Sequence, residues 1–251
     1  MSVKIDFNNF LRGFTMNIYS KQIEVDIHDV DPNGVARLSS LMRYIQGAAQ
    51  AQLTDNGKSY ENLREMKRAF ILSRIKLEFT ETVRAYDKLV AETFPCDSRG
   101  FTFLRCYLLK KFGKTIGRAV SAWALIDTDT HALVPVRNFE LGLETSSPLD
   151  LSLTRIAMPS ELKKLGEYTV VYSDLDQNNH MNNTRYPDMY SNFLPLSGKR
   201  IDEITISYLS EAARGEKLTL EGIEVGDKFY MRSIKENGKI NTEAELHLTD
   251  I

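Results

Sequence analysis

The feature that most constrains this sequence is a set of short internal matches that keep their order along the chain. The first match aligns two polar turns at an offset of 145 positions: Asp29 with Asp174, Asp31 with Asp176 and Asn33 with Asn178. Residues 81–84 match residues 211–214 at an offset of 130, and residues 113–114 match residues 238–239 at an offset of 125. A duplicated unit with a shortened second copy gives such a pattern. The sequence therefore predicts two structural repeats.

The chain length agrees with this duplication. A chain of 251 residues can form one large domain or two units of about 125 residues. Its 42% hydrophobic content is typical of a globular protein with a sizeable core. We expect an N-terminal repeat over residues 1–140, a linker over 141–165 and a C-terminal repeat over 166–251.

Each repeat is predicted to contain a strand, a helix and then several consecutive strands. Helical spacing of apolar residues runs from Leu38 to Leu53, and a second helix is expected over Asn183–Leu194. Alternating and β-branched residues predict strands over 71–79, 88–94, 101–110, 115–127, 168–172, 203–210, 217–225, 228–235 and 239–248. Glu236-Asn237-Gly238 is typical of a hairpin turn. The pattern indicates an α+β fold in which antiparallel strands wrap a central helix.

Composition excludes several classes of function. A net charge of −2 provides no general attraction for nucleic acid, and no apolar run is long enough to predict a membrane span. Residues 1–17 lack the features of a signal peptide, so we expect a cytoplasmic protein. The four scattered histidines and two cysteines form no metal-ligand or disulfide pattern. We therefore expect no metal and no cofactor, with Cys106 as a buried structural thiol.

The polar loop over residues 173–183 is the candidate for chemistry. It joins a predicted strand to a predicted helix, so acidic, amide and imidazole groups gather where backbone N–H groups favour developing negative charge. The alternative interpretation is that its Asn and Asp residues only form turns and helix caps. Both copies would need such caps equally, but Val35 occupies the position of His180 in the first copy. This asymmetry favours chemistry in the second copy alone.

The residues Asp176-Gln-Asn178-Asn-His180-Met-Asn182-Asn183-Thr-Arg-Tyr186 resemble the D-x-N-x-H-x-N-N-x-x-Y signature of the acyl-acyl carrier protein thioesterases. Residues 29–38 are similar to the opening of that family's first repeat. The resemblance spans residues 19–249 and implies a tandem, or double, hot-dog fold. It also implies hydrolysis of the thioester between a fatty acyl chain and the carrier protein. The lack of a plastid transit peptide favours a bacterial member.

The resemblance assigns four catalytic residues: Asp176, Asn178, His180 and Glu211. Plant members usually carry a cysteine next to the glutamate, but Ala212 stands there, which excludes a cysteine nucleophile at this position. Asn178 would orient the reacting carbonyl, and His180 would act as a base or hydrogen-bond donor. Asp176 and Glu211 would activate water, orient His180 or supply a carboxylate nucleophile. The remaining signature residues are predicted to be helix caps (Asn182, Asn183) and core (Tyr186), with Pro187 able to shift the start of the helix.

The family resemblance also implies a substrate channel and a partner. We expect the channel to be lined from the first repeat, with candidates that could equally be ordinary core residues: Met42, Ile45, Ala49, Phe79, Trp123 and Leu125. An acidic acyl carrier protein would need a local basic patch, for which Arg185, Lys199 and Arg200 are candidates, although a merely solvated basic face is the default interpretation of these residues. A homodimer is one expected assembly. Two alternatives stay open: an acyl-CoA thioesterase of the hot-dog class, and a hot-dog protein that binds acyl thioesters without hydrolysing them.

Overall fold

The protein forms one large antiparallel sheet that carries a few helices. The computed structural model describes residues 18–251. Ten of the strands follow the order β1-β3-β4-β5-β2-β8-β11-β10-β9-β7, and β6 pairs with β5 as the eleventh. Every pair of neighbouring strands is antiparallel. The predicted α+β class with antiparallel strands is therefore confirmed.

The elements divide between the two halves of the chain. The first half contains β1 (Tyr19–Glu24), α1 (Leu38–Asp55), α2 (Tyr60–Glu65), β2 (Arg68–Phe79), β3 (Lys88–Arg99), β4 (Thr102–Lys111), β5 (Lys114–Asp127) and β6 (Leu133–Val134). The second half contains β7 (Lys163–Thr169), α3 (Tyr186–Ser191), β8 (Lys199–Tyr208), β9 (Lys217–Val225), β10 (Lys228–Lys235) and β11 (Ile240–Asp250). Short 3₁₀ turns lie at Ile27–Asp29, Val136–Asn138, Tyr172–Asp174 and Asn183–Arg185.

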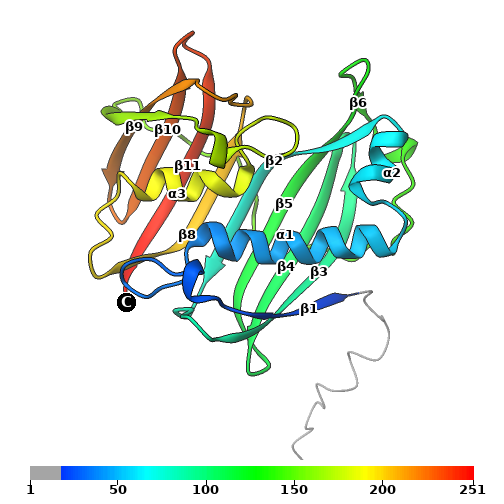
Figure 1. Ribbon diagram of the computed structural model, residues 1–251, viewed down its shortest axis with the longest axis horizontal. Helices are drawn as coiled ribbons and strands as arrows, with labels where there is room; N and C mark the ends of the chain where they lie inside the picture. Colours follow the sequence, from blue (N-terminus) through cyan, green and yellow to red (C-terminus); the bar gives the residue numbers. More distant parts are fainter. Residues whose placement is uncertain (1–17) are drawn as a thin grey trace, which may run out of the picture.

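Helices α1 and α3 lie across the same face of the sheet, one over each half (Figure 1). Apolar residues of α1 pack onto β2–β5, and Tyr186 and Tyr190 of α3 are buried against the second half. Both belong to a single hydrophobic core that runs under the two helices. No helix in residues 18–251 combines the length and the apolar character needed to cross a membrane.

The two halves are joined through β2 and β8. Ile75 pairs with Ile206, and Leu77 pairs with Ile204, in the middle of this junction. All four residues are fully buried, with 0% of their surface exposed to solvent. Because backbone hydrogen bonds and apolar packing coincide here, the halves share one continuous sheet and one core.

Backbone hydrogen bonds confirm the duplication. The Ala36 N–H donates to the Val83 carbonyl at 2.8 Å, and the Met181 N–H donates to the Ala212 carbonyl at the same distance. The two acceptors, Val83 and Ala212, are 129 positions apart. The short sequence match had aligned residues 81–84 with residues 211–214, at an offset of 130. Glu211 therefore corresponds to Thr82 and not to Glu81. The first copy lacks the carboxylate as well as the histidine.

Several predicted elements differ from the structure. The strand expected over 168–172 ends at Thr169, and Tyr172 begins a 3₁₀ turn. The helix expected over 183–194 is shorter, because a 3₁₀ turn precedes α3 and Pro187 lies in its first turn. Proline is accepted there since the first helical N–H groups lack an intrahelical partner. The strand predicted to open the first repeat was given no bounds and is β1, whereas the six-residue helix α2 was not predicted.

The segment predicted as a linker packs against the outer face of the sheet. Leu149, Leu151 and Leu153 contact a buried cluster that includes Cys96 and Cys106. Cys106 has no exposed surface, so its prediction as a buried thiol is confirmed. The final residues of the predicted linker, from Lys163, already belong to β7. This chain segment therefore covers the face opposite α1 and α3.

We predict that truncating the junction destabilises both halves together. Ile206→Ala removes buried methyl and methylene groups and should lower the free energy of unfolding by about 2–5 kcal/mol. Urea unfolding followed by circular dichroism should show one transition at a lower midpoint. The control Val225→Ala, at a side chain that is 49% exposed, should change stability by about 0.5 kcal/mol or less. Two separated transitions in Ile206→Ala would contradict a shared core.

Candidate functional site

The signature loop is a tight turn closed on itself by hydrogen bonds. The Asp176 N–H donates to the His180 carbonyl at 2.9 Å, and the Asn178 N–H donates to Asp176 Oδ1 at 2.8 Å. Asn179 completes the turn with a φ of 61°, where the first copy has Gly34. Asparagine tolerates this left-handed conformation better than most residues. These hydrogen bonds fix the backbone positions from which the side chains of Asp176, Asn178 and His180 extend.

His180 is held beside Glu211 by the neighbouring loop. The backbone of His180 forms an isolated antiparallel bridge with Ala213, which follows Glu211 by two positions. His180 Nε2 lies 3.2 Å from Glu211 Oε2, and both side chains remain partly exposed to solvent. The structure therefore brings together the predicted histidine and the predicted glutamate, although 31 positions separate them in the sequence.

Glu216 fixes the loop that carries Glu211. Its Oε2 accepts a hydrogen bond from the Ala213 N–H at 2.9 Å and lies 2.9 Å from Lys235 Nζ. Burial raises the pKa of Glu216, but the hydrogen bonds from Lys235 and Ala213 outweigh burial, so the pKa lies below its ordinary value. Asp87 does the same in the first copy, where it accepts from the Arg84 N–H and pairs with Lys111.

A pocket of about 950 Å³ lies between the sheet and helices α1 and α2, and the signature loop forms part of its wall. Asp176, Gln177 and Asn178 line it, together with Asn182 and Thr184. His180 and Glu211 are not part of this wall. The pocket is large enough for an elongated ligand, since typical small-molecule sites have volumes of about 300–1,000 Å³.

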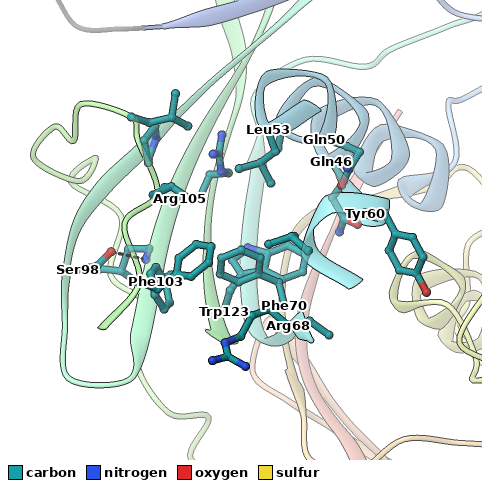
Figure 2. A pocket seen from close by; sticks show the side chains of 18 of the residues that line it. Gln46, Gln50, Leu53, Tyr60, Arg68, Phe70, Ser98, Phe103, Arg105 and Trp123 are labelled. Carbon is teal, nitrogen blue, oxygen red and sulfur yellow. Dashed lines mark hydrogen bonds between the residues drawn. The ribbon is translucent and has the colours of Figure 1, made fainter. Parts of the chain in front are cut away.

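Much of the pocket wall is aromatic. Phe70, Phe103 and Phe139 contact one another edge to face, with ring centroids 5.3 to 6.2 Å apart. Figure 2 shows Phe70, Phe103 and Trp123 in the same part of the pocket, below α1. Such rings favour apolar ligand groups.

The sequence identified only part of this pocket. Two predicted channel residues line it, Ala49 and Trp123. The other four, Met42, Ile45, Phe79 and Leu125, are buried core residues instead. Helical and strand periodicity marks an inward-facing residue but does not show whether the space beside it is filled.

Tyr60 is a residue of the site that sequence reasoning missed. It is the first residue of α2, and its hydroxyl donates to Asn178 Oδ1 at 3.0 Å. This bond occupies the Asn178 oxygen, so the amide Nδ2 is the group able to donate to a ligand. The nearest sequence signal was Ser59, which caps α2 by accepting from the Asn62 N–H. Nothing in the local sequence linked Tyr60 to a residue 118 positions away.

The remaining signature residues have structural roles, as predicted for two of them. Asn182 Oδ1 accepts hydrogen bonds from the Thr184 N–H and hydroxyl, and Tyr186 is 2% exposed. Asn182 therefore caps the 3₁₀ turn over Asn183–Arg185, and Asn183 is the first residue of this turn and not its cap. Ala212 is fully buried beside Glu211.

The three candidates for a basic patch, Arg185, Lys199 and Arg200, differ in their surroundings. Arg185 pairs with Asp174 and Asp188, and Arg200 is half-buried with Nη1 directed to the Phe79 carbonyl. Lys199 is exposed. Two of the three candidate cations thus have partners within the protein, and a docking patch at these residues stays a prediction.

Comparison with known protein families divides the chain into two matched regions. Residues 16–139 match the family described as "Acyl-ACP thioesterase N-terminal domain", and residues 158–249 match "Acyl-ACP thioesterase C-terminal domain". The chain belongs to the acyl-ACP thioesterase family. The two matched regions also agree with the two halves of the sheet.

Individual relatives support this membership. The chain is 25% identical to oleoyl-acyl carrier protein thioesterase 1, chloroplastic, of Arabidopsis thaliana, over 83% of this chain. It is 26% identical to the oleoyl-acyl carrier protein thioesterase of Coriandrum sativum, over 77% of this chain. The match spans 65% of the length of the first relative and 59% of the second.

Solved structures show the same fold. An acyl-ACP thioesterase from Bacteroides thetaiotaomicron superimposes with a TM-score of 0.82 at 24% identity, covering 92% of this chain and 98% of that one. The 12:0-ACP thioesterase from Umbellularia californica gives a TM-score of 0.75 at 16% identity, covering 93% and 98%. The large antiparallel sheet with few helices is therefore the architecture of this family.

The lowered pKa of Glu216 leads to a prediction about pH. Since ionised Glu216 stabilises the fold, its contribution is present above the ordinary value of 4.5 and is lost as the pH falls through its lower folded pKa. Glu216→Gln should reduce the free energy of unfolding at pH 7 by about 1 kcal/mol or less, because the side chain is partly exposed. Thermal unfolding measured from pH 7 to pH 3 should show this difference vanish at low pH.

The matched control is Glu221→Gln, which removes a carboxylate paired with Arg232 on the same sheet. It removes a paired carboxylate away from the Glu211 loop, so it should leave that loop in place, whereas Glu216→Gln should loosen it. A stability difference for Glu216→Gln that grows as the pH falls would contradict the assigned direction of the pKa.

Proposed function

We propose that this protein hydrolyses fatty acyl–acyl carrier protein thioesters, releasing a free fatty acid and the holo carrier protein. The observation that carries this proposal is the pocket under α1, which has an aromatic wall and ends on Asp176, Gln177 and Asn178. An acyl chain fits the apolar part, which leaves the thioester beside the polar loop. Family membership supports the same activity.

Asp176 and Asn178 are assigned to the reacting carbonyl. Asn178 Nδ2 donates a hydrogen bond to the thioester oxygen, and the Tyr60 hydroxyl, which donates to Oδ1, holds the amide in place. One oxygen of Asp176 accepts from the Asn178 N–H, and its second carboxylate oxygen is available to activate water or to attack the carbonyl itself. In either case negative charge develops on the thioester oxygen, where the Asn178 amide stabilises it.

His180 and Glu211 act as a pair. When Glu211 accepts a hydrogen bond from Nε2–H of His180, the imidazole carries its proton on Nε2 and leaves Nδ1 as the basic nitrogen. Such a carboxylate orients the ring and stabilises the protonated form after proton transfer. We assign His180 as the proton acceptor and Glu211 as its positioning residue.

The architecture is consistent with a tandem hot-dog arrangement. We divide the chain into an N-terminal hot-dog repeat over 1–140 that binds the acyl chain, a linker over 141–165 and a catalytic hot-dog repeat over 166–251. The partner is an acyl carrier protein that bears a fatty acyl chain, with no nucleic acid and no cofactor. A homodimer, a bacterial origin and a cytoplasmic location stay predictions.

The activity is tested by thiol release from acyl carrier protein and acyl-CoA substrates of several chain lengths. His180→Ala and Asp176→Ala should each lower kcat by about 100-fold or more, since each removes a group that handles a proton in the transition state. The matched control is His247→Ala, because His247 pairs with Asp202 at 2.6 Å on the opposite side of the catalytic half. It should retain wild-type turnover.

The same assay separates the alternatives. Faster release from CoA than from the carrier protein would replace the substrate assignment, and no release from either would leave a binding protein. Wild-type turnover in His180→Ala or Asp176→Ala would overturn the assigned roles.

A separate prediction concerns Tyr60. Tyr60→Phe removes the donor that orients the Asn178 amide, so kcat should fall by about tenfold while the fold is retained. Tyr19→Phe is the matched control, because the Tyr19 hydroxyl donates to Asp55 away from the signature loop. Equal turnover of the two variants would show that Tyr60 does not position Asn178.

A further inference from the structure

A buried cation lies in the part of the pocket that should hold the acyl chain. Arg105 is on β4 and lines the pocket, yet it is only 6% exposed. Figure 2 shows it near Leu53, on the far side of Trp123 and Phe70 from Tyr60. Within residues 18–251, the side-chain hydrogen bonds of Arg105 go to Gln52 and Thr93 and not to the signature loop. A hydrocarbon chain alone gives no reason for a guanidinium at this depth.

The charge of Arg105 is not neutralised within residues 18–251. Its Nη1 donates to Gln52 Oε1 at 2.6 Å and to Thr93 Oγ1 at 3.1 Å. Neither partner is charged, and in this part of the chain no carboxylate lies within ion-pair distance of Arg105. Burial lowers the pKa of the guanidinium, yet arginine stays protonated in proteins. Buried charges are normally paired, so this one calls for an acceptor.

Two donor groups of Arg105 remain for that acceptor. Both described hydrogen bonds use Nη1, and within residues 18–251 the Nε and Nη2 groups have no hydrogen-bond partner. By contrast Arg68, which also lines the pocket, is paired with Asp127. Arg43, the third arginine of the wall, is paired with Asp29. Arg105 therefore differs from both other pocket arginines in having donor groups without a partner within residues 18–251.

Further polar groups surround Arg105 on the same face of the sheet. Ser121 Oγ accepts from Trp123 Nε1 at 2.7 Å and lies 3.2 Å from the Tyr107 hydroxyl. We call Gln52, Thr93, Arg105, Tyr107 and Ser121 the polar stripe. It crosses β3, β4 and β5 beneath α1, between the aromatic wall and the apolar core.

We propose that Arg105 is a specificity-determining residue that binds an oxygen atom on the distal part of the acyl chain. The substrate class is an acyl thioester whose far end carries a hydroxyl, oxo or carboxylate group. Nε and Nη2 donate to that oxygen, while the aromatic wall holds the methylene groups between it and the thioester. This inference rests on the proposed function for the identity of the thioester, but not for the recognition of the chain.

The test compares chains that differ only at their far end. Acyl-pantetheine amides, in which NH replaces the thioester sulfur, cannot be cleaved as substrates and carry no free head-group carboxylate. For each chain length the set contains an alkyl, an ω-hydroxy and an ω-carboxy member. Trp123 is the single tryptophan of the chain and lines the pocket, so its fluorescence reports binding without requiring activity.

At the chain length that reaches Arg105, wild type should bind an oxygenated member at least tenfold more tightly than the alkyl member, because hydrogen bonds to charged groups are among the strong ones. Arg105→Met should remove this preference or reverse it. Arg105→Gln keeps N–H donors without the charge, so it should retain a preference for the hydroxyl and lose any for the carboxylate. Arg118→Met, which removes an exposed cation of β5 that pairs with Glu78, should behave as wild type.

Two results would overturn the proposal. One is a wild-type preference for the alkyl member at every length, which needs no variant to fold. The other is an equal loss of affinity for all members in Arg105→Met, as expected if Arg105 only supports the sheet. Selective binding of oxygenated amides without thiol release from any thioester would refute the proposed function and leave this inference standing.

Discussion

The pairing of β2 with β8 is the interaction on which the rest of the structure depends. It joins two similar half-sheets into one, so that helices α1 and α3 lie over the same face. This geometry brings the signature loop of the second half against the pocket of the first half. Asn178 and Tyr60, which come from different halves, meet only because the sheet is continuous. Neither half contains the complete site.

The duplicated loops show how equivalent backbones acquire different functions. Each copy has a tight turn stapled to a second loop by the same backbone hydrogen bond, and each second loop is held by a carboxylate and a lysine. The first copy carries Val35 and Thr82 at the positions of His180 and Glu211. The space under the helices also differs. Tyr186 and Tyr190 are buried under α3, whereas a pocket remains beside α1.

The sequence predicted the features that depend on local pattern. The duplication, the antiparallel strands, the long helix and the Asn182 cap all leave signals within a few residues. It did not predict Tyr60, Arg105 or the pocket boundaries, because these depend on contacts between segments far apart in the chain. It also placed Glu211 one position out of register with the first copy, since short matches do not fix an alignment to a single residue. The cations Arg185 and Arg200 looked available because their partners were not visible in the sequence.

The first copy has Val35 at the position of His180, so the histidine of the proposed site occurs in the second copy alone. Residues that line the pocket come mainly from the first half, and the groups assigned to proton transfer come from the second. Changes to the pocket floor can therefore alter which chains are accepted without disturbing the His180–Glu211 pair. Under the proposed function, the shape of the pocket and the proton-transfer pair can therefore be altered independently of each other.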